Sequence, residues 1–160
     1  MEHNIPISIV ILTYNRSAIL DILLDSLQGI QYKNLECIVV DNHSEDETEK
    51  IVTEKYPKCV YIKSEKNIGV GARNIGLKQA QGDIVICLDD DVFGIDDEAI
   101  AKVVYMFNNN PQIGAINFKV IDYLRGKQCN WIHHCRMEEY ANTIFRTYEI
   151  TEGAVAFSKQ

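Results

Sequence analysis

The sequence predicts a single α/β domain with a doubly wound, mostly parallel sheet and helices on both faces. Three observations predict this fold. Short β-branched runs of strand length alternate with amphipathic stretches of helical period. The connections between them are short. The chain has 160 residues and no internal repeat or linker, so we expect one domain over residues 1–160.

The predicted strands are short apolar runs rich in valine and isoleucine. Strands that are buried on both faces of a parallel sheet have this composition, because neither face meets water. "ISIVILT" and "DIVICLD" are dense runs of this kind, and "LECIVVD" ends on an acid. We expect strands at residues 7–13, 35–41, 59–64, 83–89, 114–121 and 153–159.

The stretches between these strands have the apolar spacing of helices that cover a sheet. In "SAILDILLDSLQGI" the leucines recur at helical intervals while Asp21 and Asp25 face water, and Gly29 suits the end of the helix. Ser44 and Glu47 stand at the spacing of a capping box, which predicts the start of the second helix. We expect helices at residues 17–30, 44–52, 71–81 and 96–107.

Composition and charge narrow the classes of function. The formal charge is −7 and no cluster of Lys and Arg stands out, which argues against a nucleic-acid-binding surface. No apolar run approaches the roughly 20 residues of a membrane span, so we expect no transmembrane segment. The start "MEHNIPISIV" lacks a basic region and a cleavage site, and Cys37 and Cys87 lie in apolar runs as free thiols do. These features predict a cytoplasmic protein.

Residues 122–148 show no clear period, and they contain the one cysteine–histidine cluster, "CNWIHHC". Structural zinc sites have paired ligands at regular spacing, which this cluster lacks. We therefore interpret it as incidental and predict no zinc site there, and we assign no role to any histidine. The members of the cluster are Cys129, His133, His134 and Cys135.

Polar residues follow three of the predicted strands. Ligands of doubly wound sheets bind beyond the carboxyl ends of the strands, so these residues are the candidates for a site. They are Thr13, Tyr14, Asn15 and Arg16 after the first strand, Asp41 and Asn42 after the second, and Asp89, Asp90 and Asp91 after the fourth.

Three neighbouring aspartates end the fourth strand, and their like charges repel unless a cation lies among them. One interpretation is a solvated acidic turn that caps the next helix. The other follows from the buried run before them, which brings Asp89 to the rim of the sheet. Alternate residues of an extended segment face the same side, so Asp89 and Asp91 can face one ligand. Carboxylate oxygens suit Mg²⁺ or Mn²⁺ better than zinc.

The ends of the first two strands allow two interpretations each. Asp41 either lies in the region that caps the next helix or, since the capping box fills that role, is available to a base or ribose. Asn15 or Ser17 can cap the first helix, while Tyr14 can lie flat beneath a base. Arg16 is interpreted as a solvated residue at the start of the helix.

The stretch "NIGVGARNIG" is rich in glycine but lacks the third glycine of a dinucleotide-binding fingerprint, and it follows the third strand instead of the first. It indicates either the start of a helix that packs closely on the sheet or a segment that holds Arg73 at the rim of the sheet for contact with a ligand. A guanidinium fixed at the rim can contact a base or a phosphate.

Four stretches taken together resemble the family-2 inverting glycosyltransferases, whose nucleotide-sugar-binding fold is called GT-A. "SIVILTYNR" is similar to the opening strand and loop of that family, and "CIVVDNHSEDET" to its second strand with a nucleoside-binding Asp. "NIGVGARNIGLKQAQGDIVICLDDDV" resembles the segment that ends in the Asp-x-Asp (DXD) motif. "TEGAVAFSK" is similar to a strand near the acceptor. The first three stretches match well and the fourth more loosely.

The resemblance implies a role for each rim residue. The nucleobase would be held by the loop of Thr13 and Tyr14 and by Asp41, with Arg73 nearby. Asp89 would contact the ribose or a metal-bound water. Asp91 would bind Mn²⁺ or Mg²⁺, and Asp90 would line the same pocket. The implied nucleotide-binding residues are Thr13, Tyr14, Asn15, Asp41, Arg73, Asp89 and Asp90, and the implied metal ligands are Asp91 and Asp89.

The resemblance also implies an activity. A hexose would be transferred, with inversion, from a nucleotide-diphosphate donor, UDP-sugar before others, to a hydroxyl of a glycan, lipid or polysaccharide precursor. The product would belong to a polysaccharide or to the cell envelope. The implied location is the cytoplasm, including the inner face of a membrane.

Two departures from the family pattern qualify these expectations. Where relatives often read Asp-Asp-Gly-Ser, this chain has "DNHS" at residues 41–44. The family's general base follows the strand that resembles "GAVAFSK", but the sequence stops at Gln160, and Glu152 precedes that strand. We therefore expect the donor-binding part of a longer enzyme, without an identified catalytic base. We also expect self-association through an uncovered apolar flank.

Three other classes of protein compete with this interpretation. A nucleotide-binding module without turnover would differ from the enzyme only in lacking the general base of the transfer reaction. A receiver domain of a signalling pathway would need an acidic pair after the first strand, where "TYNRS" stands. A nucleotidyltransferase would need a glycine-rich basic loop at the same place, and that loop is absent from the sequence.

Overall fold

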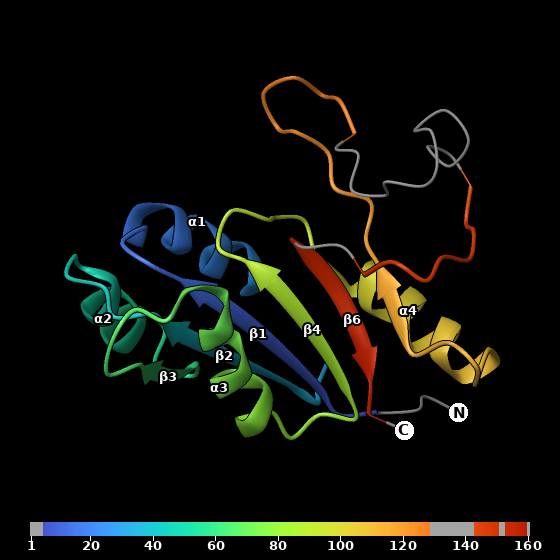
Figure 1. Ribbon diagram of the computed structural model, residues 1–160, viewed down its shortest axis with the longest axis horizontal. Coiled ribbons are helices and arrows are strands. Elements are labelled where there is room, and N and C mark those ends of the chain that lie inside the picture. The colour runs from blue at the N-terminus through green and yellow to red at the C-terminus, as the bar shows by residue number, and fades with distance from the viewer. Residues whose placement is uncertain (1–4, 129–142, 151–152, 160) are drawn as a thin grey trace.

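A six-stranded sheet lies between two layers of helices (Figure 1). The computed structural model describes residues 5–128, 143–150 and 153–159. The strands are β1 (Ile7–Thr13), β2 (Leu35–Asp41), β3 (Val60–Lys63), β4 (Ile84–Asp89), β5 (Ala115–Asn117) and β6 (Ala154–Ser158). The helices are α1 (Ser17–Leu27), α2 (Thr48–Lys50), the π-helical turn η1 (Ile51–Lys55), the 3₁₀ turn η2 (Gly69–Ala72), α3 (Arg73–Gln79) and α4 (Asp97–Asn109).

The strand order is β3-β2-β1-β4-β6-β5. The four strands from β3 to β4 are parallel, whereas β6 pairs antiparallel with both β4 and β5. The predicted α/β fold with a mostly parallel sheet is confirmed. The insertion of the last strand between β4 and β5 was not predicted, because strand order across a long connection leaves no local pattern in the sequence.

The buried side chains form one cluster on each face of the sheet. On one face, Ile9 and Ile11 of β1 pack with apolar residues of α1 and α4. On the other face, Val10 of the same strand packs with residues of η2 and α3. This alternation along β1 confirms that the sheet is covered on both faces.

The helix α3 approaches the sheet closely at Gly76. A Cβ atom at this position would lie 2.6 Å from a methyl group of Val10 and 2.7 Å from one of Val40. Only glycine therefore fits there without displacing β1 or β2. The close packing holds α3 against the sheet and places its first residue, Arg73, at the carboxyl end of the neighbouring strands.

Several predicted elements differ in length or in their ends. The second helix begins at Thr48 instead of Ser44, and no side chain caps it from the preceding position. The predicted capping box of Ser44 and Glu47 is therefore wrong. β5 has three residues and is therefore shorter than the strand predicted at residues 114–121. The cysteine–histidine cluster, which was interpreted as incidental, lies outside the described residues.

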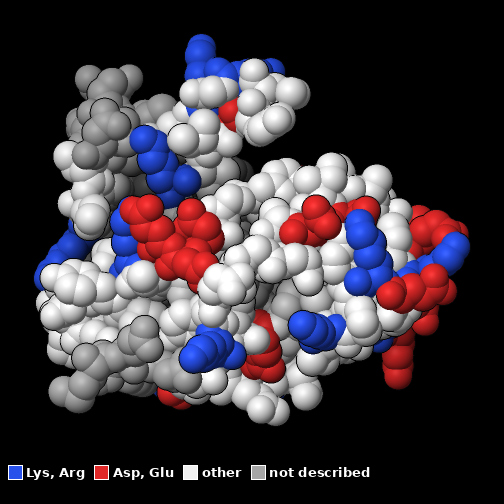
Figure 2. All heavy atoms as spheres, turned by 180° about the vertical axis from the view of Figure 1, so that it is seen from behind, with Lys and Arg blue, Asp and Glu red and all other residues white. Residues whose placement is uncertain are grey.

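None of the helices within the described residues is long and apolar enough to cross a membrane. On the face shown in Figure 2, Lys and Arg side chains lie among Asp and Glu side chains. Four lysines form ion pairs with acidic side chains: Lys50–Glu47, Lys55–Asp21, Lys63–Glu49 and Lys102–Glu98.

Candidate functional site

The carboxyl ends of β1, β2 and β4 meet at one edge of the sheet. The register pairs Thr13 with Asp41 on one side of β1 and Leu12 with Asp89 on the other. The three sets of candidate residues that follow these strands are therefore neighbours in space, as the sequence predicted.

Asp90 is the buried centre of a polar cluster at this edge. Its residue is 4% exposed, and its carboxylate accepts a hydrogen bond from the Thr13 hydroxyl at 2.8 Å. Arg16 donates from Nη1 to Asp90 Oδ1 and to Asp91 Oδ2, both at 3.0 Å. One guanidinium therefore bridges two of the three aspartates and offsets their repulsion.

Burial raises the pKa of the Asp90 carboxyl, and the hydrogen bonds from Thr13 and Arg16 oppose this effect. The hydrogen bond to Asp90 raises the pKa of Arg16 in turn. Arg16 lies at the N-cap position of α1 and is exposed, as predicted, but its contact with the aspartates was not predicted. It is half exposed, but its charged end is bound to the acidic cluster.

The third aspartate, Asp89, pairs with a different arginine. Asp89 Oδ1 forms an ion pair with Nη2 of Arg73, which leaves the other carboxylate oxygen, Oδ2, on the side of Gly153. The backbone N–H of Asp89 donates to the Gly153 carbonyl at 2.8 Å, so the start of the last strand borders the site. The Nε of Arg73 is buried and lacks a hydrogen-bond partner among the described residues.

The backbone turns directly after Asp89, where the N–H of Val92 donates to the Asp89 carbonyl at 3.2 Å. The extended alternation that was expected to bring Asp89 and Asp91 to one side therefore ends before Asp91. In the structure the two carboxylates pair with different arginines. Their side chains are 38% and 51% exposed, so both can reach a ligand from the solvent.

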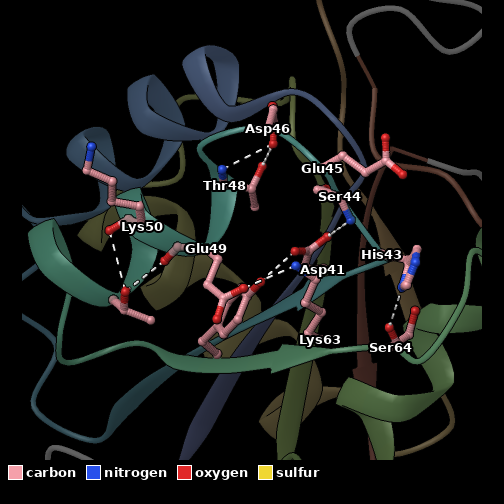
Figure 3. A network of polar contacts seen from close by, with 12 residues as sticks. Asp41, His43, Ser44, Glu45, Asp46, Thr48, Glu49, Lys50, Lys63 and Ser64 are labelled. Atoms are coloured by element: carbon pink, nitrogen blue, oxygen red, sulfur yellow. Dashed lines mark hydrogen bonds and ion pairs between the residues drawn. The ribbon is translucent and has the colours of Figure 1, made fainter.

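Asp41 has no exposed surface, and it is the centre of a second network (Figure 3). The N–H of Ser44 donates to one carboxylate oxygen at 2.7 Å, and the Tyr61 hydroxyl donates to the other at 2.5 Å. Burial and this hydrogen bond raise the pKa of Tyr61. The acid that was predicted to be available to a ligand therefore holds the loop after β2, and a direct contact with a base requires one of these bonds to open.

The loops after β1 and β2 are locked together by Asn15. Its backbone N–H donates to the Ser44 hydroxyl at 2.9 Å, and its side-chain oxygen accepts from the N–H of Glu45 at 2.8 Å. Asn15 and His43 both have positive φ angles, 51° and 73°. Tyr14, at the tip of the first loop, is 45% exposed and presents its ring to the solvent.

Sequence reasoning missed Asp46, which joins the starts of two helices. Its carboxylate accepts from the N–H of Ser17 at 2.9 Å and from the N–H of Thr48 at 3.1 Å. It therefore caps α1 from a distant part of the chain, in place of the predicted Asn15 or Ser17. Burial alone would raise the pKa of Asp46, but the hydrogen bonds from Thr48 and Ser17 hold it below its usual value.

Asn42 ties the end of β2 to the glycine-rich loop. Its amide nitrogen donates to Asn67 Oδ1 at 2.8 Å and to the Gly69 carbonyl at 3.1 Å, and its oxygen accepts from the N–H of Ile68 at 2.9 Å. This loop leads into α3, so Asn42 helps to set the position of Arg73. The signal in the sequence that could have indicated this role is an asparagine directly after the aspartate that ends a strand.

The carboxylate oxygens at this edge of the sheet suit a hard divalent cation. Asp89 and Asp91 each present one carboxylate oxygen that no described residue binds, and Mg²⁺ and Mn²⁺ prefer such oxygens. Among the described residues no three acidic, histidine or cysteine side chains already form a metal cluster. The residues present fit a cation that the protein shares with an anionic ligand, which would supply the remaining oxygens.

Curated proteins similar to this chain are glycosyltransferases. The chain is 34% identical over 113 residues to the poly-beta-1,6-N-acetyl-D-glucosamine synthase of Staphylococcus epidermidis, covering 69% of this chain and 27% of the relative. It is 31% identical over 142 residues to an uncharacterized glycosyltransferase of Haemophilus influenzae, covering 86% and 56%. The chain therefore spans between about a quarter and just over half of these relatives.

Solved structures of two proteins have a similar fold. Residues 1–349 of Staphylococcus aureus TarS in complex with UDP match with a TM-score of 0.67 at 27% identity, over 78% of this chain and 38% of that one. The mannosyltransferase PcManGT of Pyrobaculum calidifontis, in complex with GDP-Man and Mn²⁺, matches with a TM-score of 0.72 at 22% identity, over 98% and 45%. The fold is that of the GT-A glycosyltransferases.

A family model covers the three strand ends that build the site. The model described as "Glycosyl transferase family 2" matches residues 8–156, which include all of β1 but its first residue, every element from α1 to β5 and most of β6. The resemblance seen in the sequence is thereby confirmed, and the chain belongs to glycosyl transferase family 2.

Proposed function

We propose that this chain binds the donor in the transfer of a hexose from a nucleoside-diphosphate sugar to an acceptor hydroxyl, with inversion at the anomeric carbon. The observation that carries the proposal is the set of three aspartates and two arginines at the carboxyl edge of β1 and β4, in a member of family 2. The set offers carboxylates to a cation and guanidinium groups to phosphates.

Arg16 can exchange partners without a large loss of stability. Arg16 and Asp91 are about half exposed, 50% and 51%, and ion pairs at such positions contribute roughly 0–1 kcal/mol. A diphosphate that replaces a carboxylate therefore meets little resistance. Arg73 brings an additional donor, because its buried Nε has no partner among the described residues.

The nucleoside would lie on the loops that follow β1 and β2. Tyr14 presents an exposed ring on which a base can stack. Asn15 and Asp41 shape these loops, and Thr13 holds Asp90 in place beneath them. Arg73, Asp89 and Asp90 would line the ribose and phosphate side of the pocket.

The metal ligands would be Asp91 and Asp89, and the ion Mn²⁺ or Mg²⁺. When bound, such an ion neutralises the diphosphate as it leaves with increasing negative charge. The mannosyltransferase PcManGT, whose fold is shared with this chain, was solved in complex with GDP-Man and Mn²⁺. Arg16, which lies against Asp90 and Asp91, would orient these carboxylates and add positive charge near the leaving group.

The preferred donor is a UDP-sugar, because the TarS structures that match above 25% identity hold UDP and UDP-GlcNAc. The acceptor would be a saccharide or a lipid-linked saccharide of a cell-envelope polymer, as the name of the Staphylococcus epidermidis relative suggests. Cytoplasmic placement, including the inner face of a membrane, and self-association remain part of the proposal.

A second candidate is a nucleotide-binding unit without turnover. It is favoured because none of the described residues is assigned the role of general base. Incubation of the chain with a donor and an acceptor separates the two functions, since only the first gives product.

Thermal unfolding with UDP, GDP, CDP or dTDP, each with and without Mn²⁺, tests the proposal. A nucleotide at about 100 times its dissociation constant stabilises the native state by roughly 2.7 kcal/mol. We expect a Tm increase that needs Mn²⁺ and is largest for UDP. Asp91→Asn should abolish it, while Asp25→Asn, on the exposed face of α1, should retain it. An unchanged Tm with all four nucleotides would contradict the proposal.

A further inference from the structure

Two thiols lie side by side at the amino end of the sheet, far along the strands from the candidate site. Cys37 belongs to β2, and Cys59 directly precedes the edge strand β3 (Figure 1). The parallel register pairs Ile38 with Val60, so Cys37 and Cys59 occupy the preceding pair of positions. Cα atoms of adjacent strands are about 4.8 Å apart, which lies within the roughly 4.4–6.8 Å that disulfides span.

The two side chains point to the same face and are in contact. Both pack against the core cluster that includes α1. They also line a cavity of about 180 Å³ between the end of α1 and the sheet. Both residues are partly buried and line this same cavity.

The two thiols differ in how readily they ionise. The neighbouring Cys37 thiol lowers the pKa of Cys59, whereas the Cys59 thiol and burial raise the pKa of Cys37. Cys87 provides a comparison, since it is buried in the core of the opposite face and burial raises its pKa to about 11. Cys59 is therefore the thiol that attacks first, because the thiolate is the reactive form.

We propose that Cys37 and Cys59 form a redox-active dithiol that closes to an intramolecular disulfide on reaction with a low-molecular-weight disulfide. This inference does not rest on the glycosyltransferase proposal, because it concerns the opposite end of the sheet and a different chemistry.

The reaction balances as two thiol–disulfide exchanges. The Cys59 thiolate attacks one sulfur of the small disulfide; the S–S bond breaks, and one small thiolate leaves and takes up a proton. The Cys37 thiol loses its proton and attacks the Cys59 sulfur, and the second small thiolate leaves and is protonated. Two protein thiols are oxidised, and one small disulfide is reduced to two thiols.

The disulfide would fasten the edge strand β3 to β2. It would lie two residues before the pair Val39 and Tyr61, and Tyr61 donates the hydrogen bond that holds Asp41. Closure of the loop between residues 37 and 59 restricts the unfolded chain, and we expect the Tm to rise by roughly 5 °C or more.

The experiment titrates the full chain with glutathione buffers of increasing oxidised fraction. The background carries Cys129→Ser and Cys135→Ser, so that only three cysteines remain. Free thiols are blocked with N-ethylmaleimide, and the protein is digested with trypsin for mass spectrometry. We expect a cross-link between the peptides of residues 34–50 and 59–63, blocked Cys87, and a higher Tm that dithiothreitol reverses.

A variant separates the roles of the two thiols. Cys37→Ser lacks the resolving thiol, so Cys59 should stop at a mixed disulfide with one glutathione. If this variant does not fold, the cross-link in the parent protein still decides the question. The proposal is overturned if Cys37 and Cys59 remain open to N-ethylmaleimide throughout the titration, or if both carry glutathione with no cross-link between them.

Discussion

Asp41 and Asp90 are both buried aspartates at the carboxyl edge of the sheet, yet they are held in different ways. Asp41 is bound by neutral donors, the Ser44 N–H and the Tyr61 hydroxyl. Asp90 is bound by a hydroxyl and by Arg16, which also binds the exposed Asp91. The end of β2 is therefore closed on itself, whereas the end of β4 carries charges that a ligand from the solvent can engage.

This difference separates structural from functional acids within one edge. A carboxylate that accepts hydrogen bonds from its own loop and from the next strand stabilises the scaffold. The carboxylate of Asp91, which is half exposed like its partner Arg16, keeps one oxygen for a cation and can exchange partners at little cost. Substitutions at the two strand ends should accordingly affect stability at one and ligand binding at the other.

The largest effect on stability is expected for Asp41→Ala. The substitution leaves the Ser44 N–H and the Tyr61 hydroxyl without their acceptor in a buried place. We expect a loss of about 3 kcal/mol in the free energy of unfolding, measured by urea denaturation. A variant of normal stability that no longer binds nucleotide would show that Asp41 contacts the ligand instead of holding the loop.

Asp91→Asn should give the converse result. The side chain is half exposed and its ion pair with Arg16 contributes little, so the free energy of unfolding should change by less than about 0.5 kcal/mol. Nucleotide binding in the presence of Mn²⁺ should weaken at least tenfold, about 1.4 kcal/mol. Titration calorimetry measures the affinity, with Asp25→Asn as the matched control. Equal affinity of the two variants would show that Asp91 does not contribute to nucleotide binding.

Tyr61→Phe should have a smaller effect on stability than Asp41→Ala. It removes one hydrogen bond to Asp41 and keeps the ring and the Ser44 contact. A loss of about 1 kcal/mol is expected. Tyr105→Phe, at a 67% exposed position of α4, serves as the control and should be neutral. Equal values for the two variants would mean that the Tyr61 hydroxyl does not stabilise Asp41.

The smallest effect is a pH dependence that arises from Asp90. Burial raises the pKa of this carboxyl in the folded protein. The folded state therefore binds the proton more tightly than the unfolded chain. Its contribution to stability is present in full below the ordinary pKa of aspartate, and it is lost as the pH rises through the raised pKa.

The Tm of the parent protein minus that of Asp90→Asn should therefore be larger at about pH 4 than at about pH 7. Calorimetric scans across this range measure the difference. A difference that grows with pH would mean that the hydrogen bonds from Thr13 and Arg16 outweigh burial, and that Asp90 is stabilised as an anion.

The sequence predicted the edge of the sheet well, because each part of it is local. Dense apolar runs identified β1, β2 and β4, and the polar residues directly after them had to meet at one edge of a parallel sheet. The position of Arg73 followed in the same way from a helix packed closely on the sheet. The family resemblance rested on the same segments.

What the sequence did not predict depends on contacts between distant segments. Asp46 caps α1 from 29 residues away, and Tyr61 binds Asp41 from the neighbouring strand. The contact of Arg16 with the aspartates was not predicted because its partner Asp90 lies 74 residues further on. The alternation assumed for Asp89 and Asp91 failed because the strand ends at Asp89 and the chain turns.

The most direct test of the account is a calorimetric titration of UDP into the parent protein, with and without Mn²⁺. The account predicts saturable binding at one site per chain that requires the metal ion, and much weaker binding to Asp91→Asn under the same conditions. Binding that is equal with and without Mn²⁺, or unchanged by the substitution, would contradict the assignment of the β4 edge as the donor site.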